Sequence, residues 1–398
     1  MFGAKHSFIV ILLIFALIMG EMANNIYVPS LPLLVAEFQV GVATISVSIG
    51  MGLLGCCLAF PVYGPLSDRL GRQQVLLTGI LIFIFGSLLC YLATSASFFS
   101  VARLIQGVGI AAPYILGIAV IRDLFDHSRF SKIMSFIHMA IALAPAMAPI
   151  IGGYVTFYLG WRQNFFLIAV AGAILWFWMR LSMPETLSTE KRRSWSFADV
   201  IADYRQVVLN PAFVGYSLIS GLVYAGLWAY LATVPYVFEA LGVGVKQFGY
   251  YQSLLVGVYA GGAYFNSRVV EQWGVNYLLS RALSLTLFGA ILFLSAVWLS
   301  PTSSHVMCLS LLPFCFGMGC VFANAATCAM DIFSEIKGAA SAVLCSIESL
   351  VPVFVVTLLG LFHDGTMMPA GLGILSLTLL AFWLHRWLQV YELKALKG

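Results

Sequence analysis

The first apolar stretch of the chain carries the side chains with the clearest capacity for chemistry. Glu21 and Asn25 stand four residues apart and so share one face of a helix, and Tyr27 follows them. Removing a carboxyl group from water favours its neutral form, so Glu21 is a candidate to take and release a proton near neutral pH. The alternative is a Glu21 that stays neutral or ion-paired and only joins helices. We also treat Glu21, Asn25 and Tyr27 as candidate solute contacts.

Two further ionisable residues interrupt apolar stretches. Because an unpaired guanidinium is costly there, Arg103 must face the protein interior and find acceptors, with Gln106 as its partner. Arg103 then either anchors neighbouring helices or tunes a proton on a nearby carboxylate. Glu348 is the carboxylate deepest in the second half of the sequence, and it is either structural or functional. Arg103 and Glu348 join Glu21 as candidates for proton coupling.

Other polar and aromatic residues of the apolar stretches are candidate solute contacts. Helix packing is the alternative for each, because aromatic and amide side chains also join helices. The candidates are Tyr114, His138, Trp228, Tyr230, Asn324 and Glu348.

The composition indicates that membrane spans position these side chains. Of the 398 residues, 61% are hydrophobic and 9% are charged. A soluble domain has roughly 25% charged residues. A helix needs about 20 apolar residues to cross the hydrocarbon core of a bilayer. We expect twelve such segments, at residues 8–35, 42–66, 74–95, 98–121, 132–157, 164–183, 211–238, 246–266, 276–299, 305–329, 336–362 and 370–390.

The basic residues are spread unevenly over the connections between these segments. Seventeen of the 20 Lys and Arg residues fall on the side of the N-terminus, and Arg103 lies within a segment. The opposite side holds Arg162 and Lys246. Because the cytoplasmic loops of membrane proteins hold the excess of Lys and Arg, both termini are predicted to be cytoplasmic.

A polar segment divides the expected spans into two sets of six. We expect an N-terminal six-helix bundle at 1–183, a cytoplasmic linker at 184–210 and a C-terminal six-helix bundle at 211–398. A short amphipathic helix is expected at 196–207. A shift of 203 residues brings similar residues of the two halves into register, which indicates parallel repeats. The pairs are Tyr27 with Tyr230, Pro32 with Pro235, Asp68 with Glu271, Gly71 with Gly274 and Pro149 with Pro352.

The loop between the second and third expected spans combines glycine and charge. Its glycines allow a tight turn, and Asp68 can face a helix N-terminus or pair with an arginine of the next segment. The loop resembles the signature G-x-x-x-D-R-x-G-R-R of the major facilitator superfamily, with Gln73 in place of the last arginine. The resemblance implies an all-α membrane protein of twelve transmembrane helices in two pseudo-symmetric six-helix bundles. It also implies a conformational latch at Gly64, Asp68, Arg69, Gly71 and Arg72.

The fifth expected span contains a second motif of this superfamily. The segment from Pro145 to Gly153 resembles the antiporter motif G-x-x-x-G-P-x-x-G-G. Pro145 and Ala148 replace its first two glycines, while Pro149, Gly152 and Gly153 are kept. The resemblance implies that these positions serve exchange of substrates, since small residues and proline let helices pack closely and bend.

Two shorter motifs lie nearby. The segment from Arg103 to Gly109 resembles the superfamily pattern R-x-x-Q-G-x-G. The turn that begins at Gly160 resembles the G-W-R-x-x-F turn of drug-exporting members, and we expect Trp161 to anchor the chain at the outer membrane interface.

The first and fourth expected spans resemble those of Bcr/CflA-type drug exporters, through residues 25–32 and 119–125. Those relatives have an aspartate at the position of Asn25, and an amide carries no proton, so coupling has either passed to Glu21 or weakened or changed in kind. The resemblance implies proton-driven export of a small organic solute or drug across the inner membrane by alternating access. The alternative is a dedicated carrier of a siderophore or metabolite, working in either direction.

Other classes of function fit the sequence less well. It has no nucleophile–base pair and no phosphate loop, so we do not expect an enzyme. A receptor or structural protein leaves the intramembrane charges unexplained. All eight cysteines fall in apolar runs, against a disulfide framework or zinc site. We expect no cofactor, no metal and no nucleic-acid partner. The expected partners are a small-molecule substrate, protons and the lipid bilayer, and the protein is expected to be a monomer.

Overall fold

The computed structural model describes residues 4–125, 127–187, 197–333 and 335–395, which form helices and short connections. The N-terminal half comprises α1–α7. Its bounds are α1 Ala4–Asn25, the 3-10 turn η1 Val28–Ser30, α2 Leu31–Phe38, α3 Val42–Leu70, α4 Arg72–Tyr91, α5 Ala96–Leu124, α6 His127–Leu159 and α7 Arg162–Ser182.

The C-terminal half comprises α9–α15 and follows the short helix α8, Phe197–Val208. Its bounds are α9 Pro211–Ala240, α10 Val245–Trp273, α11 Val275–Leu299, α12 Ser304–Ser310, α13 Leu312–Asp331, α14 Lys337–Leu361 and α15 Met368–Ala395. The short helix expected at 196–207 is confirmed as α8. The division of the chain at 1–183, 184–210 and 211–398 stays a prediction.

Most of the expected spans meet simple criteria of length and apolarity. Ten stretches of helix among the described residues are long and apolar enough to cross a membrane, with α2 continuing α1 and α13 continuing α12. The other two spans of the fold are α6, for which only Leu143–Leu159 counts as an apolar stretch, and the more polar α10. Since α6 and α10 pack against each other, α10 turns part of its polar surface away from lipid.

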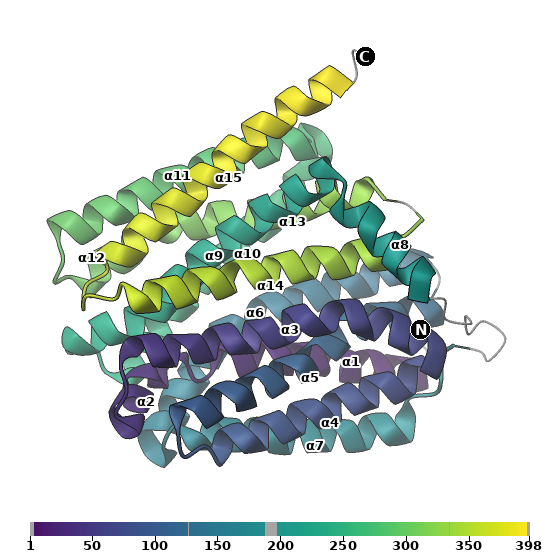
Figure 1. The fold of residues 1–398 in the computed structure, drawn as a ribbon, viewed down its shortest axis with the longest axis horizontal. Helices are drawn as coiled ribbons and strands as arrows, with labels where there is room; N and C mark the ends of the chain where they lie inside the picture. The colour runs from purple at the N-terminus through teal and green to yellow at the C-terminus, as the bar shows by residue number, and fades with distance from the viewer. Residues whose placement is uncertain (1–3, 126, 188–196, 334, 396–398) are drawn as a thin grey trace.

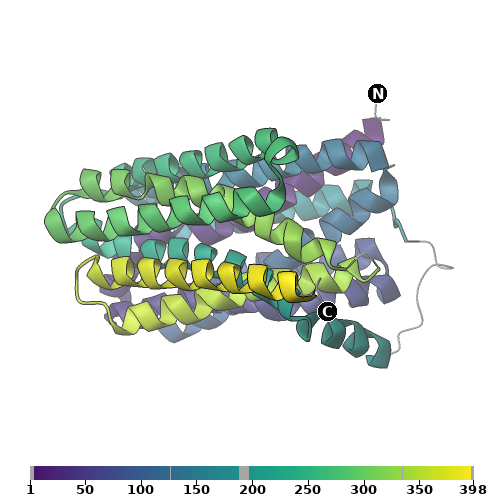
Figure 2. The same cartoon turned by 90° about the horizontal axis from the view of Figure 1, so that it is seen from above.

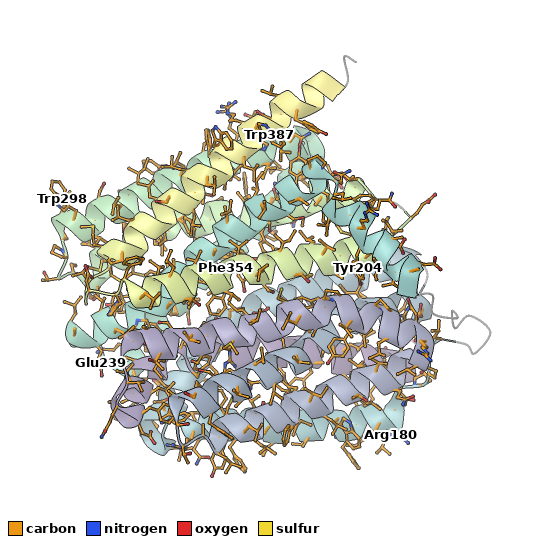
Figure 3. The ribbon with its side chains drawn as sticks, viewed as in Figure 1. Arg180, Tyr204, Glu239, Trp298, Phe354 and Trp387 are labelled. Atoms are coloured by element: carbon orange, nitrogen blue, oxygen red, sulfur yellow. The ribbon has the colours of Figure 1, made fainter. Side chains whose placement is uncertain are left out.

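The outer surface of the bundle suits a lipid solvent. Trp298 is 73% exposed and Phe354 is 67% exposed, and Figure 3 shows both on the outside of the helices. Large exposed apolar side chains continue over most helices, in contrast to the scattered single residues of a water-soluble surface. The structure is therefore that of a multi-pass membrane protein.

The two halves repeat the same backbone. A shift of 203 residues carries the bounds of α3, 42–70, onto those of α10, 245–273. Gly71 and Gly274 end these helices with φ of 104° and 80°, a region that is unfavourable for residues with a Cβ. Gln39 and Gly242, also 203 residues apart, both have positive φ, of 54° and 80°. The turns thus fall at equivalent positions in both halves.

The halves meet along two helix pairs, α3 with α14 and α6 with α10. Figure 1 shows α3 and α14 side by side, and Figures 1 and 2 place α8 and both termini toward the same end of the helices. We call the opposite end, where α6 ends and α10 begins, the far end. At the far end a Cβ on Gly360 of α14 would lie 2.7 Å from the Ser46 side chain of α3, so the halves are in tight contact there.

Candidate functional site

Glu21 lies in α1 on the side that faces α5. Its carboxylate accepts a hydrogen bond from the hydroxyl of Tyr114. The neighbouring Gly20 lets the helices approach, since a Cβ there would lie 3.1 Å from Ile110 of α5. Glu21 and Tyr114 lie deep inside the protein, yet both keep part of their surface accessible. Glu21 therefore faces an internal space and not the lipid.

The C-terminal half contributes the opposite wall of this space. Tyr224 of α9 and Tyr259 of α10 lie deep in the protein, are partly accessible, and are each within electrostatic range of both Glu21 and Glu348. Glu348 of α14 is 8% exposed and accepts a hydrogen bond from the Ser220 hydroxyl of α9 at 2.5 Å. Two carboxyl groups, one from each half, thus lie within electrostatic range of the same two tyrosines.

Arg103 anchors helices within the N-terminal half. It is 1% exposed and donates to the carbonyl oxygen of Ala23 at 3.2 Å, to the Asn24 side chain at 3.3 Å and to the side-chain oxygen of Gln106. Its guanidinium also lies 4.5 Å from the ring centre of Tyr27. These partners tie α5 to the end of α1, and the predicted pairing with Gln106 is confirmed.

Glycine makes room for this arginine. A Cβ on Gly52 of α3 would lie 2.7 Å from the Arg103 guanidinium. Gln106 passes the network on to α4, because its side-chain nitrogen donates to the Ser87 hydroxyl at 2.8 Å. Arg103 therefore holds α1, α4 and α5 together at the level where α1 ends.

The candidates Asn25, at the end of α1, and Tyr27, just after it, point into the helix or the core. The Asn25 side chain donates to the backbone oxygen of Glu21, one turn earlier in the same helix, at 2.9 Å. Tyr27 has no exposed surface and packs against Phe99 and Phe165. Neither side chain reaches across to the C-terminal half through these contacts.

The candidates of the C-terminal half are also buried. Tyr230 is fully buried and packs against Phe293, and Trp228 is 2% exposed with its ring edge-to-face against Tyr224. Asn324 pairs with Asn266, donating at 2.6 Å, and so joins α13 to α10. The side chain of His138 lies outside the described residues.

The loop after α3 forms an ion cluster at the end that carries the termini. Arg72 pairs with Asp68 at 2.7 Å and with Asp123 of α5 at 3.5 Å. The Glu185 carboxylate accepts from the backbone nitrogen of Arg72 at 2.9 Å, which places a negative charge at the N-terminus of α4. The predicted pairing of Asp68 with an arginine is confirmed, while Arg69 is exposed. These contacts all lie within the N-terminal half and the segment that follows it.

The exchange motif lies where three helices meet. A Cβ on Gly152 would lie 1.7 Å from the backbone oxygen of Ile26, and one on Gly153 would lie 2.7 Å from the backbone oxygen of Val245. Gly152 thus faces the turn after α1 of its own half, and Gly153 faces α10 of the other half. Pro149 is buried near Gly249 of α10, and Pro145 is half-buried.

Trp161 does not lie at the lipid interface, so that expectation was wrong. It is 4% exposed, packs edge-to-face against Phe38, Phe99 and Phe165, and donates its indole hydrogen to Glu37. Trp161 is held in the aromatic cluster by its edge-to-face contacts, and Glu37 supplies the acceptor that the indole needs.

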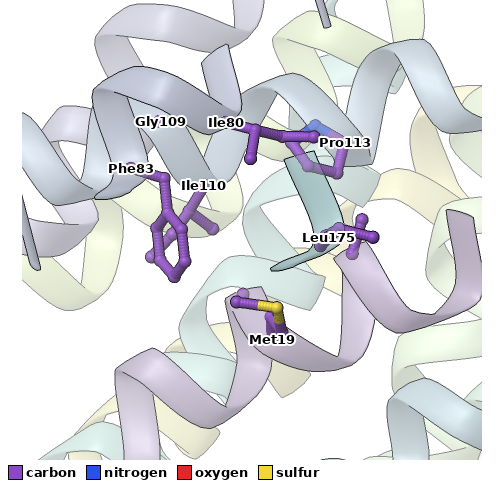
Figure 4. A pocket seen from close by; sticks show the side chains of 9 residues that line it. Met19, Ile80, Phe83, Gly109, Ile110, Pro113 and Leu175 are labelled. Carbon is purple, nitrogen blue, oxygen red and sulfur yellow. The ribbon is translucent and has the colours of Figure 1, made fainter. Parts of the chain in front are cut away.

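A small cavity lies inside the N-terminal half, and Gly20, the neighbour of Glu21 in the chain, is one of its lining residues. Its volume is about 10 Å³, and its lining from α1, α4, α5 and α7 is entirely apolar (Figure 4). Without a polar group it is a packing gap and offers a solute no specific contact.

Residues 13–356 of the chain match the protein-family model that is described as Major Facilitator Superfamily. The chain belongs to this superfamily. Its members are membrane transporters of small molecules, so the protein is a membrane transporter.

Individual members of this superfamily are similar in sequence to this protein over most of its length. It is 27% identical to an uncharacterized MFS-type transporter, YdgK, of Bacillus subtilis, covering 93% of this chain and 92% of that protein. It is 27% identical to a bicyclomycin resistance protein homolog of Haemophilus influenzae, covering 87% of each. It is 28% identical to the multidrug resistance protein MdtM of Escherichia coli, covering 76% of this chain and 73% of that protein.

Solved structures show the same fold. A D-xylose–proton symporter superposes with a TM-score of 0.77 at 16% identity, covering 96% of this chain and 98% of that chain. A bacterial homologue of the lysosomal transporter Spinster superposes with a TM-score of 0.78 at 13% identity, covering 97% of both. The predicted major facilitator fold of two six-helix bundles is thereby confirmed.

Several residues of the site were not among the candidates selected from the sequence. Tyr224, Tyr259 and Ser220 line or support the space, and Asn24 holds Arg103. One signal was present for Tyr224, because the 203-residue shift that relates the halves carries Glu21 onto it.

Proposed function

We propose that this protein exports small organic solutes, with drugs as the class of substrate, and that an inward flow of protons drives the export. The placement of Glu21 carries the proposal: an ionisable group in a transmembrane helix that faces an internal space between the halves. The names of the relatives support drugs over a siderophore, since two of the three are named for drug resistance.

In the proposed mechanism, a proton and the substrate compete for Glu21. Binding of the substrate favours the charged carboxylate, and protonation on the outer side neutralises it and releases the cargo. The Tyr114 hydroxyl stabilises the charged form by donating to it. Tyr224, Tyr259 and Glu348 offer contacts from the other half, so the substrate touches both halves and senses their separation.

Orientation and latch follow the same scheme. Both termini are proposed to be in the cytoplasm, in the bacterial inner membrane, with the protein acting as a monomer. The far end is then the outer end of the protein. Because the two halves are in contact there, the structure corresponds to the inward-facing form. When the far end opens, we propose that the cluster of Asp68, Arg69 and Arg72 closes against the C-terminal half and holds the cytoplasmic end shut.

The test is transport by Glu21→Gln in proteoliposomes. An imposed proton gradient should drive accumulation of a drug substrate by the wild-type protein, while the variant should show no accumulation above protein-free vesicles. Downhill exchange of the drug should survive in the variant, because a glutamine keeps the shape of the site. The matched control is Glu239→Gln at the far end (Figure 3), which should transport as the wild type does. Full gradient-driven accumulation by Glu21→Gln would reject the proposal.

A further inference from the structure

The far end of α6 holds a lysine of the other half between aromatic rings. The ammonium nitrogen of Lys246, in the first turn of α10, lies 3.6 Å from the ring centre of Phe157 and 4.4 Å from that of Tyr158. The ring centre of Tyr154 lies 5.4 Å away. All three distances are within the range of cation–π attraction, about 6 Å. We call Tyr154, Phe157 and Tyr158 the aromatic cage.

The cage has the features of a site for an organic ammonium ion. Three ring faces supply negative potential, and the Tyr158 hydroxyl oxygen adds a polar contact to Lys246 at 3.1 Å. In the part of the chain that the structure describes, no carboxylate forms an ion pair with Lys246. The rings, and not an opposite charge, therefore hold this ammonium group.

The cage and its occupant belong to different halves. Tyr154, Phe157 and Tyr158 are on α6, and Lys246 is on α10. The two backbones touch beside the cage, at Gly153 and Val245, and the Tyr154 and Tyr250 hydroxyls are 2.8 Å apart. Any separation of the halves at the far end therefore withdraws Lys246 and leaves the rings without their cation.

We propose that Tyr154, Phe157 and Tyr158 form a second cation-binding site, which Lys246 fills in this closed form and which takes a small quaternary or tertiary ammonium ion when the halves part. The rings are 38%, 61% and 67% exposed, so a solute reaches them once Lys246 has left. A cation bound there competes with Lys246 and delays closure of the far end. The site is independent of Glu21, so it does not rest on the export mechanism.

The test is binding of choline to the purified full-length protein by isothermal titration calorimetry. Lys246→Ala removes the occupant and should bind choline at least tenfold more tightly than the wild type, a gain of about 1.4 kcal/mol. Lys337→Ala is the matched control, an exposed lysine at the other end of the molecule, and should bind as the wild type does. The uncharged isostere 3,3-dimethylbutan-1-ol should not bind to either variant.

The double variant Lys246→Ala, Phe157→Leu tests the rings themselves. It should lose the gained affinity while unfolding at the same temperature as Lys246→Ala, because Phe157 is largely exposed. Three results would each overturn the proposal: equal choline affinity in the wild type and Lys246→Ala, equal affinity for the uncharged isostere, or full affinity in the double variant. None of these measurements involves a gradient or Glu21, so the proposed export function is tested separately.

Discussion

The N-terminal and C-terminal halves share a backbone but not their chemistry. Gly71 and Gly274 end equivalent helices with positive φ, and α3 and α10 have equivalent bounds. Yet the 203-residue shift carries Glu21 of α1 onto Tyr224 of α9 in the C-terminal half. The repeat therefore fixes where the helices run, while single substitutions decide where charge lies.

This difference places unequal tasks on the two halves. The N-terminal half holds the Glu21 carboxylate on a scaffold that Arg103 stiffens through its hydrogen bonds to α1. The C-terminal half offers tyrosines and places its own carboxylate, Glu348, on α14. When the two halves rock against each other, the residues of the C-terminal half move relative to Glu21, while its contacts within the N-terminal half stay the same. A proton-coupled carrier requires such a change in the surroundings of its proton-binding group.

The largest effect is expected from substituting the two residues of one equivalent pair, Glu21 and Tyr224, one at a time. Glu21→Gln should abolish gradient-driven transport, while Tyr224→Phe should keep it and raise KM by less than about tenfold, since it removes one hydroxyl and keeps the ring. Initial rates of drug uptake in proteoliposomes measure both. Loss of driven transport in Tyr224→Phe would show that the halves share the coupling task.

The buried polar networks of the two halves should differ in stability. Arg103→Met leaves Asn24 and Gln106 without their charged partner, and we expect a loss of about 3–5 kcal/mol. Asn324→Ala breaks a neutral pair with Asn266, and we expect about 1–2 kcal/mol. Thermal unfolding in detergent shows which of the two variants loses more stability. An Asn324 variant as unstable as the Arg103 variant would contradict the comparison.

Two adjacent glycines make different kinds of contact: Gly152 packs within its own half, and Gly153 packs against the other half. Gly152→Ala should lower the unfolding temperature, because its Cβ would overlap the Ile26 oxygen of the same half. Gly153→Ala should change stability less and instead disfavour the closed far end, where its Cβ meets Val245. Labelling of a cysteine placed at Tyr250 should then be faster in Gly153→Ala than in Gly152→Ala. Equal labelling would remove the distinction.

The last comparison concerns the turns that the two halves share. Gly71→Ala and Gly274→Ala should each cost about 1–3 kcal/mol, because both require positive φ. Gln39→Gly should change stability by less than about 1 kcal/mol, since relief of the left-handed conformation offsets the added freedom of the unfolded chain. Chemical unfolding followed by tryptophan fluorescence resolves these differences. A cost at Gly71 without one at Gly274 would break the symmetry of the turns.

Much of the fold could be predicted because its signals are local. Apolar length located the spans, the 203-residue shift located the repeat, and a polar segment of suitable pattern gave α8 at Phe197–Val208. Glu21 could be found for the same reason, since a carboxyl group in an apolar helix is conspicuous. Its direction, toward Tyr114 and the space between the halves, depended on the packing of α1 and α5.

The remainder of the site lacked such signals. Tyr224 lies in α9, which is apolar on all sides, so periodicity does not separate the face toward the space from the face toward lipid. Asn24 and Asn25 are adjacent, and a turn of about 100° between neighbours decides that Asn24 meets Arg103. Trp161 was misplaced because tryptophan suits both a lipid interface and a buried cluster with an acceptor such as Glu37.

The most direct measurement of the central claim is proton release on substrate binding by the purified protein in weakly buffered detergent solution near neutral pH. If Glu21 exchanges its proton for substrate in the space between the halves, the wild type should release protons on binding. Glu21→Gln should bind the same drug without release. Equal proton release from both proteins would contradict the account.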